Sequence, residues 1–223
     1  MQTEQTSEPP LNGYEKRRRA ISSRILEVTA NMIRESGDTK MSTRSIAEKA
    51  GVSLATPFNH FKSKQGILSA IIEESLSNDF YVQNAEQKKA RSVLDILINT
   101  SFHYINDEAL FRPLFQSVLT QTPGTSRPSF QQALSAIEKQ LEYDKSNGSL
   151  VSNVNLRILA EQLETYWLGS MILWCSKTID SEDWINRIRH GVSALLTPVM
   201  LTEQQNTANR KYKKLERAIS EIR

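Results

Sequence analysis

The sequence is poor in the residues that form tight turns and cross-links. Its 223 residues include only 8 glycines, 7 prolines and 1 cysteine. So few turn residues argue against β-sandwiches, β-barrels and doubly wound sheets, all of which need many tight turns. The single Cys175 excludes an internal disulfide and a cysteine-based metal cluster, and it is expected to be an inert buried thiol.

Long apolar runs are missing as well. The longest uncharged apolar stretch, YWLGSMILWCS at 166–176, is shorter than the roughly 18 residues that a membrane helix needs. The opening residues, MQTEQTSEPP, have neither the basic nor the apolar region of a signal peptide. We therefore expect a soluble, cytoplasmic protein.

Catalytic and metal-binding patterns are also lacking. The three histidines, His60, His103 and His190, are far apart along the chain, and no HExxH or Cys/His ligand spacing is found. There is no glycine-rich phosphate loop either. These absences predict that the protein is not an enzyme and needs no metal or cofactor.

Basic charge, in contrast, is concentrated in one segment. Residues 16–64 contain eleven Lys and Arg against four Asp and Glu, a net +7, whereas residues 65–208 contain eleven against sixteen, a net −5. A basic block joined to an acidic body is typical of a polyanion-binding module attached to a second domain. A solvated charged face gives the same pattern, so charge alone leaves both interpretations open.

Apolar residues recur at helical spacing along most of the chain, which predicts an all-α fold. The first helix runs from Lys16 to a stop at Gly37, a second is capped by Ser42 and ended by Gly51, and Ser63 caps another. Later helices are expected at 92–106, 113–121 with a possible first turn before Pro113, 127–146, 153–177 and 182–197, and residues 209–223 form either a basic amphipathic helix or a marginal tail.

Two short helices joined by a tight turn are predicted between Ser42 and Phe61. Gly51 permits a turn conformation that a Cβ atom would oppose, and Ala47 is small where the two helices cross. Val52 can fill the space between the helices. This order of features is typical of a helix-turn-helix, whose second helix enters the DNA major groove.

The stretch TRSIAEKAGVSLATPFNHFKSKQGIL, residues 43–68, resembles the DNA-binding domain of TetR-type transcriptional regulators. The positions that match the family pattern are Arg44, Ile46, Ala47, Ala50, Gly51, Val52, Ser53, Thr56, His60, Phe61, Ser63, Lys64 and Leu68. The resemblance covers about residues 16–70, and beyond them only the number, length and order of helices are similar. It implies an N-terminal three-helix helix-turn-helix domain, followed by a larger helical ligand-binding and dimerisation domain.

On this basis the chain divides into a disordered arm at 1–13, a DNA-binding domain at 14–63, an effector-binding and dimerisation domain at 64–201, and a basic C-terminal helix or tail at 202–223. The resemblance implies a homodimer that binds a palindromic operator in double-stranded DNA. It also implies a repressor that a small, largely apolar effector of unknown identity releases from the operator.

Two residues of the second short helix depart from the family pattern. Phe58 replaces a tyrosine whose hydroxyl commonly contacts a DNA phosphate, although its ring can still pack. Pro57 replaces a Leu, Ile or Phe. We favour a helix that starts near Leu54 under a Ser53 cap, with a distorted first turn. The alternative has Thr56 as the cap and Pro57 as the first residue, which leaves only about one turn.

Residue types suggest how this unit contacts DNA. Leu54, Ala55 and Pro57 can meet thymine methyl groups, and Asn59 can pair with adenine. The full set of candidate DNA-binding residues is Arg18, Arg19, Ser42, Thr43, Arg44, Ser53, Leu54, Ala55, Thr56, Pro57, Asn59, His60 and Lys64. Those at helix starts or with basic side chains suit phosphates, and Arg44 can reach either a phosphate or a base. His60 as a core histidine and Lys62 as a plain surface lysine remain alternatives.

The second domain has two helices with broad apolar surfaces, and in the family the corresponding helices form a four-helix dimer interface. Candidate interface residues are Trp167, Gly169, Ser170, Trp184, Ile188, Val192 and Leu195. Candidate effector-pocket residues, mostly large and apolar with a few polar groups, are Asn99, Phe102, His103, Phe111, Phe115, Gln116, Tyr166, Met171 and Trp174. Ordinary core packing is the alternative for both sets. A DNA-bound adaptor that recruits a protein, and an all-α enzyme or carrier, remain rival functions.

Overall fold

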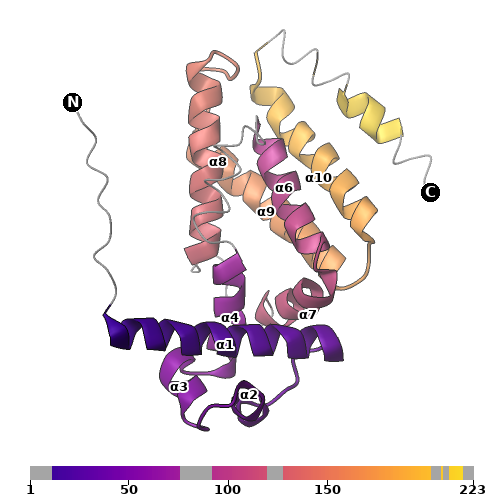
Figure 1. The fold of residues 1–223 in the computed structure, drawn as a ribbon. Coiled ribbons are helices and arrows are strands. Elements are labelled where there is room, and N and C mark those ends of the chain that lie inside the picture. Colours follow the sequence, from indigo (N-terminus) through magenta and orange to yellow (C-terminus); the bar gives the residue numbers. More distant parts are fainter. Residues whose placement is uncertain (1–11, 76–91, 120–127, 202–206, 208–210, 218–223) are drawn as a thin grey trace. The chain divides into compact units, whose positions relative to one another are not determined.

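A computed structural model describes residues 12–75, 92–119, 128–201, 207 and 211–217 of the chain (Figure 1). These residues form helices and turns without a strand, apart from an isolated antiparallel bridge between Leu150 and Met200. The chain divides into two compact units, Met1–Ile71 and Ile72–Arg223. The division falls inside a helix, α4 (Lys64–Ser75), whereas the sequence suggested a domain boundary at its start.

The N-terminal unit contains α1 (Gly13–Ser36), α2 (Thr43–Ala50), α3 (Thr56–Phe61) and the first part of α4. Asn12 and Glu15 form a capping box, so α1 already begins within the arm predicted at 1–13, the rest of which lies outside the described residues. Gly37, with φ of 71°, ends α1 as predicted. The core of this unit is a set of fully buried side chains, which includes Ile25, Ile33, Ile46, Ala47, Ile67 and Leu68.

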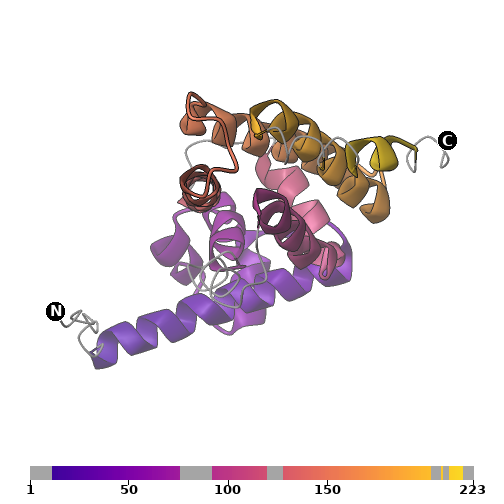
Figure 2. The same cartoon turned by 90° about the horizontal axis from the view of Figure 1, so that it is seen from above.

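The C-terminal unit contains α6 (Val93–Ile105), α7 (Glu108–Leu119), α8 (Pro128–Ser146), α9 (Leu156–Cys175), α10 (Ser181–Leu196) and a 3₁₀ turn at Thr197–Val199. Helix α9 packs against α7, α8 and α10, and α6 packs against α10 (Figures 1 and 2). Pro113 lies inside α7 and not at its start. The possible helical turn before Pro113 is therefore present, and α7 does not begin at the proline.

Three buried tryptophans, each with its indole N–H in a hydrogen bond, lie in the core of the C-terminal unit. Each indole N–H donates to a serine hydroxyl: Trp167 to Ser101 at 2.8 Å, Trp184 to Ser170 at 3.0 Å, and Trp174 to Ser181 at 3.0 Å. The rings of Trp174 and Trp184 stack with their centroids 4.5 Å apart. Buried tryptophans need a partner for the N–H group, and these bonds supply one for each ring.

The C-terminal basic segment is helical over residues 211–217. Its Tyr212 ring stacks on His190 of α10, with the ring centroids 4.4 Å apart, and Glu216 lies 3.9 Å from the imidazole Nε2 of His190. Of the two possibilities left open for this segment, these residues therefore favour a helix that packs on α10.

Candidate nucleic-acid interface

The turn between α2 and α3 has the geometry that the sequence predicted. Ser42 caps α2 in a capping box with Ser45, whose N–H donates to the Ser42 hydroxyl at 3.0 Å. Gly51 ends α2 in the left-handed conformation, with φ of 65°, and the Val52 N–H then bonds to the Ala47 carbonyl at 3.0 Å. A side chain at Gly51 would oppose this backbone, so the glycine fixes the angle between the helices.

Helix α3 begins at Thr56, so the favoured start near Leu54 is wrong. The reason is Pro57, which has no N–H to donate to the Ser53 carbonyl. That carbonyl instead accepts from the Thr56 N–H at 2.9 Å, which closes a tighter turn before the helix. The Ser53 hydroxyl lies 2.7 Å from the Thr56 hydroxyl and caps no backbone group of α3, whose N-cap position is Ala55. The short-helix alternative is closer to the structure.

One face of α3 and the preceding turn points to solvent, and we call it the readout face. It consists of Leu54, Ala55, Phe58, Asn59 and Lys62, which follow one another at helical spacing and are all exposed. The side chains of Leu54 and Phe58 are 57% and 62% exposed. The expectation that the Phe58 ring packs is therefore wrong.

Pro57 lies on the opposite side of α3 and is buried. Its ring is therefore out of reach of a thymine methyl, and the prediction that it contacts DNA is wrong. The cause is the rotation of the short helix, which turns Pro57 inward when Leu54 and Phe58 point outward. Thr56 is half-buried beside it.

His60 is held in place by α1. Its Nδ1 lies 2.7 Å from the Ser22 hydroxyl, and its side chain is half-buried. Burial lowers the pKa of His60, and the nearby Arg18 guanidinium lowers it further. A neutral imidazole meets a phosphate through a hydrogen bond and not through charge. Nothing in the sequence pattern indicated Ser22, because it is distant along the chain and stands beside the apolar stripe of α1.

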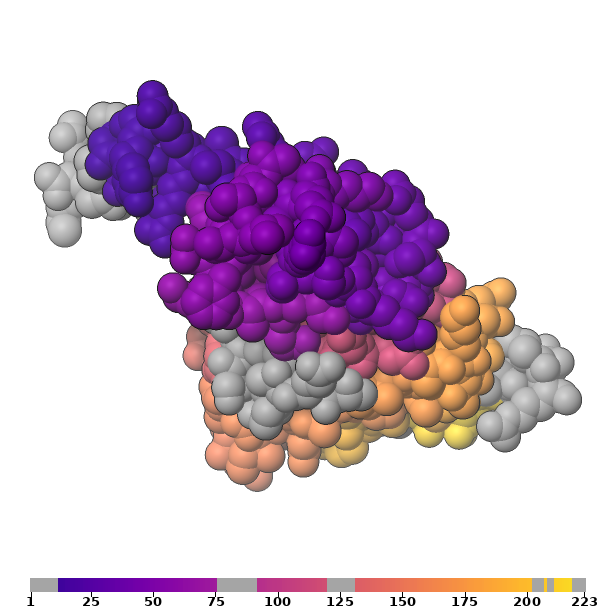
Figure 3. Space-filling model, turned by 90° about the horizontal axis from the view of Figure 1, so that it is seen from below, coloured from indigo at the N-terminus to yellow at the C-terminus, as the bar shows by residue number. Residues whose placement is uncertain are grey.

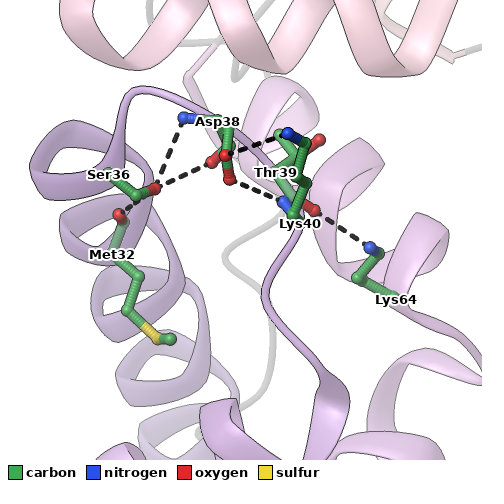
Figure 4. Close-up of polar contacts among 6 residues, drawn as sticks. All are labelled: Met32, Ser36, Asp38, Thr39, Lys40 and Lys64. Atoms are coloured by element: carbon green, nitrogen blue, oxygen red, sulfur yellow. Dashed lines mark hydrogen bonds and ion pairs between the residues drawn. The ribbon is translucent and has the colours of Figure 1, made fainter.

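Lys64, predicted to bind phosphate, is engaged within the protein (Figure 4). Its ammonium donates to the Thr39 carbonyl at 2.9 Å, which ties the start of α4 to the loop between α1 and α2. In the same loop the Lys40 N–H donates to the Asp38 carboxylate at 2.8 Å. Lys64 therefore supports the position of α2, and an ammonium already bound to a carbonyl is less free to contact DNA.

The other predicted phosphate ligands lie on the surface of the N-terminal unit, one face of which is seen in Figure 3. Arg18 and Arg19 on α1, and Ser42 and Thr43 at the start of α2, are exposed. The exposed Arg44 donates from Nε to the Glu48 carboxylate at 2.9 Å, an i,i+4 pair on the surface of α2. Such a pair is weak and can be exchanged for a DNA phosphate.

Most residues predicted for the dimer interface lie inside the protomer. Trp167, Ser170, Trp184, Ile188 and Val192 are at most 6% exposed, because α9 and α10 pack these faces against each other and against α6. They therefore cannot form a contact surface, and for them the core alternative is correct. Of the same set, Gly169 is exposed and Leu195 is half-buried.

The predicted effector residues fall into three groups. Phe111, Phe115, Met171 and Trp174 are buried, Asn99, His103 and Tyr166 are half-buried, and Phe102 and Gln116 are exposed. Phe111 and Phe115 pack on the ring of Tyr104, at 4.8 and 4.7 Å between centroids. Tyr166 instead points to α10, where its hydroxyl donates to the Arg187 carbonyl at 2.9 Å. The structure therefore does not bring all nine residues to one place.

An open groove of about 450 Å³ lies on the surface of the C-terminal unit. It is lined by Ile158, Glu161, Gln162, Thr165, Tyr166 and Leu195. Within the described residues, no helix is long and apolar enough to cross a membrane, and no three His, Cys, Asp or Glu side chains are arranged to hold a metal ion.

The N-terminal unit defines the class of the protein: an all-α protein with a helix-turn-helix whose second helix presents an exposed face. Residues 25–71 match the family described as bacterial regulatory proteins, tetR family. The DNA-binding unit of this chain is thus similar to that of the TetR family of helix-turn-helix transcriptional regulators. The expected resemblance and the expected all-α fold are thus confirmed for the described residues.

Individual relatives support this assignment. The HTH-type transcriptional regulator YvkB of Bacillus subtilis (strain 168), itself uncharacterised, is 40% identical over 60 residues, which are 27% of this chain and 32% of YvkB. The HTH-type transcriptional repressor KstR2 of Rhodococcus jostii (strain RHA1) is 22% identical over 154 residues, 65% of this chain and 76% of KstR2. The first of these matches thus spans only about a third of the relative's length.

The fold of the whole chain is similar to solved structures. SmeT, the repressor of the Stenotrophomonas maltophilia multidrug efflux pump SmeDEF, superimposes with a TM-score of 0.59 at 19% identity, over 81% of this chain and 90% of SmeT. At this identity the likeness extends to the fold, and the ligands of SmeT remain its own.

Proposed function

We propose that this protein is a dimeric, sequence-specific DNA-binding regulator that represses transcription by occupying an operator. The observation that carries this proposal is the exposed readout face of α3, presented by a helix-turn-helix unit that matches the tetR family. A second helix whose exposed face has basic charge only at its end, at Lys62, suits the major groove. Binding to an operator also places the protein in the cytoplasm.

The DNA contacts divide between bases and phosphates. Leu54, Ala55 and Asn59 on the readout face are suited to base edges, whereas Arg18, Arg19, Ser42, Thr43 and Arg44 are exposed around it and suited to phosphates. The buried Pro57 and the engaged Lys64 support this arrangement from within. Base contacts set the sequence preference, and phosphate contacts supply most of the affinity.

The test begins with the selection of bound sequences from a random pool of duplex DNA. Fluorescence anisotropy on the selected site is then measured between 50 and 200 mM salt, where we expect affinity to fall by on the order of 10³-fold or more. Arg18→Ala should weaken binding to every sequence and make the dependence on salt less steep, while Arg157→Ala, in the other unit, should change neither. A selection that enriches no sequence, or binding that salt does not weaken, rejects the proposal.

A dimer is supported by an uncharged stripe with an isoleucine at each end on the exposed side of α9. Ile158, Gln162, Thr165, Gly169 and Ile172 follow one another at spacings of four, three, four and three, and all are exposed. Ile158 and Ile172 are each 52% exposed, which is costly for a lone protomer. Small residues between them allow the same helix of a second copy to approach closely. We propose this stripe, with Leu195 of α10 beside it, in place of the buried residues predicted from the sequence.

We further propose that a small, largely apolar molecule binds the C-terminal unit and releases the DNA. SmeT, which has the same fold, has been solved in complex with triclosan. In this chain, the half-buried His103 stands beside the aromatic cluster of α6 and α7, with its ring centroid 5.5 Å from that of Phe111. Burial lowers the pKa of His103, which keeps the imidazole neutral and suited to an uncharged ligand. A screen for compounds that both raise the melting temperature and release the selected DNA tests this step.

A further inference from the structure

We propose that Leu54 and Phe58 together recognise the 5-methyl groups of thymine, so that Phe58 is a base-reading residue of this regulator. The inference rests on the proposed DNA-binding function and deepens it. The new element is the role of Phe58. From the sequence, the replacement of the family tyrosine by Phe58 predicted only the loss of a phosphate contact. The structure assigns the ring a different position, on the readout face and outside the core.

The two side chains are adjacent on the readout face. Leu54 lies in the turn before α3 and Phe58 in the first turn of α3, and both side chains are exposed. The Lys62 N–H bonds to the Phe58 carbonyl at 2.8 Å and the Asn59 N–H to the Ala55 carbonyl at 3.0 Å, so the backbone that carries Phe58 is held by helical hydrogen bonds. Their 57% and 62% exposure makes them the most exposed large apolar side chains of this segment.

Phe58 cannot turn away from this face without a rearrangement of the unit. The buried Pro57 on one side and the half-buried His60, held by Ser22 at 2.7 Å, on the other fix the rotation of α3 about its axis. A six-residue helix with two inward anchors has little freedom to roll. The ring is therefore presented to whatever the readout face meets.

The lack of charge at the centre of the readout face determines which group of the DNA it can contact. Residues 53–61 contain no Lys or Arg, whereas the surrounding segment, 16–64, has a net charge of +7 from eleven basic and four acidic residues. The segment is thus attracted to DNA, but the centre of its readout face offers no charge. In the major groove, the C5-methyl group of thymine is the apolar feature of the base edges. Two neighbouring apolar side chains therefore fit neighbouring thymines.

The experiment removes only the methyl groups. Duplexes carrying the selected site are prepared with each thymine replaced in turn by uracil, which keeps every hydrogen-bonding group and lacks the 5-methyl. We expect a roughly 3- to 10-fold loss of affinity at one or two positions in each half-site. In Phe58→Ala the loss at one of these positions should disappear, and in Leu54→Ala the loss at the neighbouring one.

Tyr14→Ala is the matched control, because Tyr14 is an aromatic residue of the same unit that is 74% exposed but lies on α1. Tyr14→Ala should leave unchanged, at every position, the ratio of the affinity for the thymine duplex to the affinity for the uracil duplex. Circular dichroism of the three variants should match the parent protein, since none of these side chains is buried.

Three results overturn the inference while the proposed function stands: selected sites without thymine in the half-site centre, uracil that weakens binding nowhere, or uracil effects that all persist in Phe58→Ala. A Phe58 ring wedged between base pairs would give the last of these together with a change in DNA bending. A selection that yields no preferred sequence at all rejects the proposed function itself.

Discussion

At the scale of single residues, backbone chemistry decides the shape of the DNA-binding unit. Pro57 shortens α3 because it cannot donate a hydrogen bond to Ser53, and its buried ring turns Leu54 and Phe58 outward. Gly51 provides the left-handed turn between α2 and α3. Neither residue belongs to the readout face, yet both determine which side chains that face presents.

Gly51→Ala should destabilise the N-terminal unit by about 1–2 kcal/mol, because φ of 65° places a Cβ atom against the backbone. The space around Gly51 is open, so the whole cost comes from the backbone conformation. Gly13→Ala is the control, since Gly13 also has open space but no positive φ, and we expect a change within about 0.5 kcal/mol. Urea unfolding followed by circular dichroism measures both. Equal effects would contradict the assignment of the cost to φ.

Glu164 on α9 gives the stability a dependence on pH. Burial raises its pKa to about 7, against the opposing effect of Arg157 and with a further rise from Glu161. Among the described residues, no group donates a hydrogen bond to its buried Oε1 atom. Because the pKa is raised from an ordinary value of 4.5, ionisation of Glu164 in the folded protein costs free energy. The protein should lose stability as the pH rises from 4.5 to 7, with the full cost present above that window.

Glu164→Gln removes this cost. We expect the free energy of unfolding to rise by about 1 kcal/mol at pH 8, a value reduced because the side chain is partly exposed, and to change little at pH 5. Glu142→Gln, which replaces an exposed carboxylate on α8, serves as the control and should show no such difference between the two pH values. A gain that is the same at pH 5 and pH 8 would show that Glu164 does not titrate between them.

At the scale of helices, the C-terminal unit depends on one close approach between α9 and α10. Gly191 of α10 lies directly under the ring of Tyr166, whose hydroxyl bonds to the Arg187 carbonyl at 2.9 Å. Any Cβ atom at position 191 would overlap the ring. The two helices are thus set at a distance that only glycine allows while Tyr166 stays in place.

Gly191→Ala should therefore destabilise the C-terminal unit by about 1–3 kcal/mol, the usual cost of overpacking. Tyr166→Leu in the same protein should restore much of the loss, since the shorter side chain leaves room for the methyl group. Chemical unfolding of the two single variants and the double variant gives the coupling energy. Strictly additive effects would mean that Gly191 and Tyr166 do not constrain each other.

The positions of the helices could be predicted well from the sequence, but the surfaces against which each helix packs could not. Ser42, Gly51 and Ser63 act locally, so their caps and turns follow from residue type and order, and the Gly66 N–H does donate to the Ser63 hydroxyl at 2.9 Å. The apolar surfaces of α9 and α10 were assigned to a dimer because periodicity does not say which protein surface covers a residue. Trp167, for example, finds Ser101, 66 positions away along the chain.

At the scale of the whole molecule, the proposed association depends on which surface of α9 stays outside. The inward side carries Trp167, Ser170 and Trp174, and the outward side carries Ile158 and Ile172. A palindromic operator requires two copies, and the outward side is the apolar surface that the C-terminal unit offers along a full helix. A charge placed there should separate the copies without unfolding either.

Ile172→Glu should raise the dimer dissociation constant by about tenfold or more, which corresponds to a loss of about 1.4 kcal/mol. Tyr143→Glu is the control, because Tyr143 is also apolar and 62% exposed but lies on α8. Sedimentation velocity over a range of concentrations measures both, and anisotropy should show weaker operator binding for Ile172→Glu alone. An unchanged sedimentation profile for Ile172→Glu would exclude this stripe as the interface.

The three tryptophans, 167, 174 and 184, are the only ones in the chain, and all belong to the C-terminal unit. Intrinsic tryptophan fluorescence is therefore a signal from that unit alone. Trp174 is stacked on Trp184 and lies under the Arg112 guanidinium, 4.9 Å from the ring centroid, so its emission is sensitive to small shifts of α7 against α9. Fluorescence compared with the circular dichroism of the whole chain can thus tell whether the two units unfold together or in sequence, without any added label.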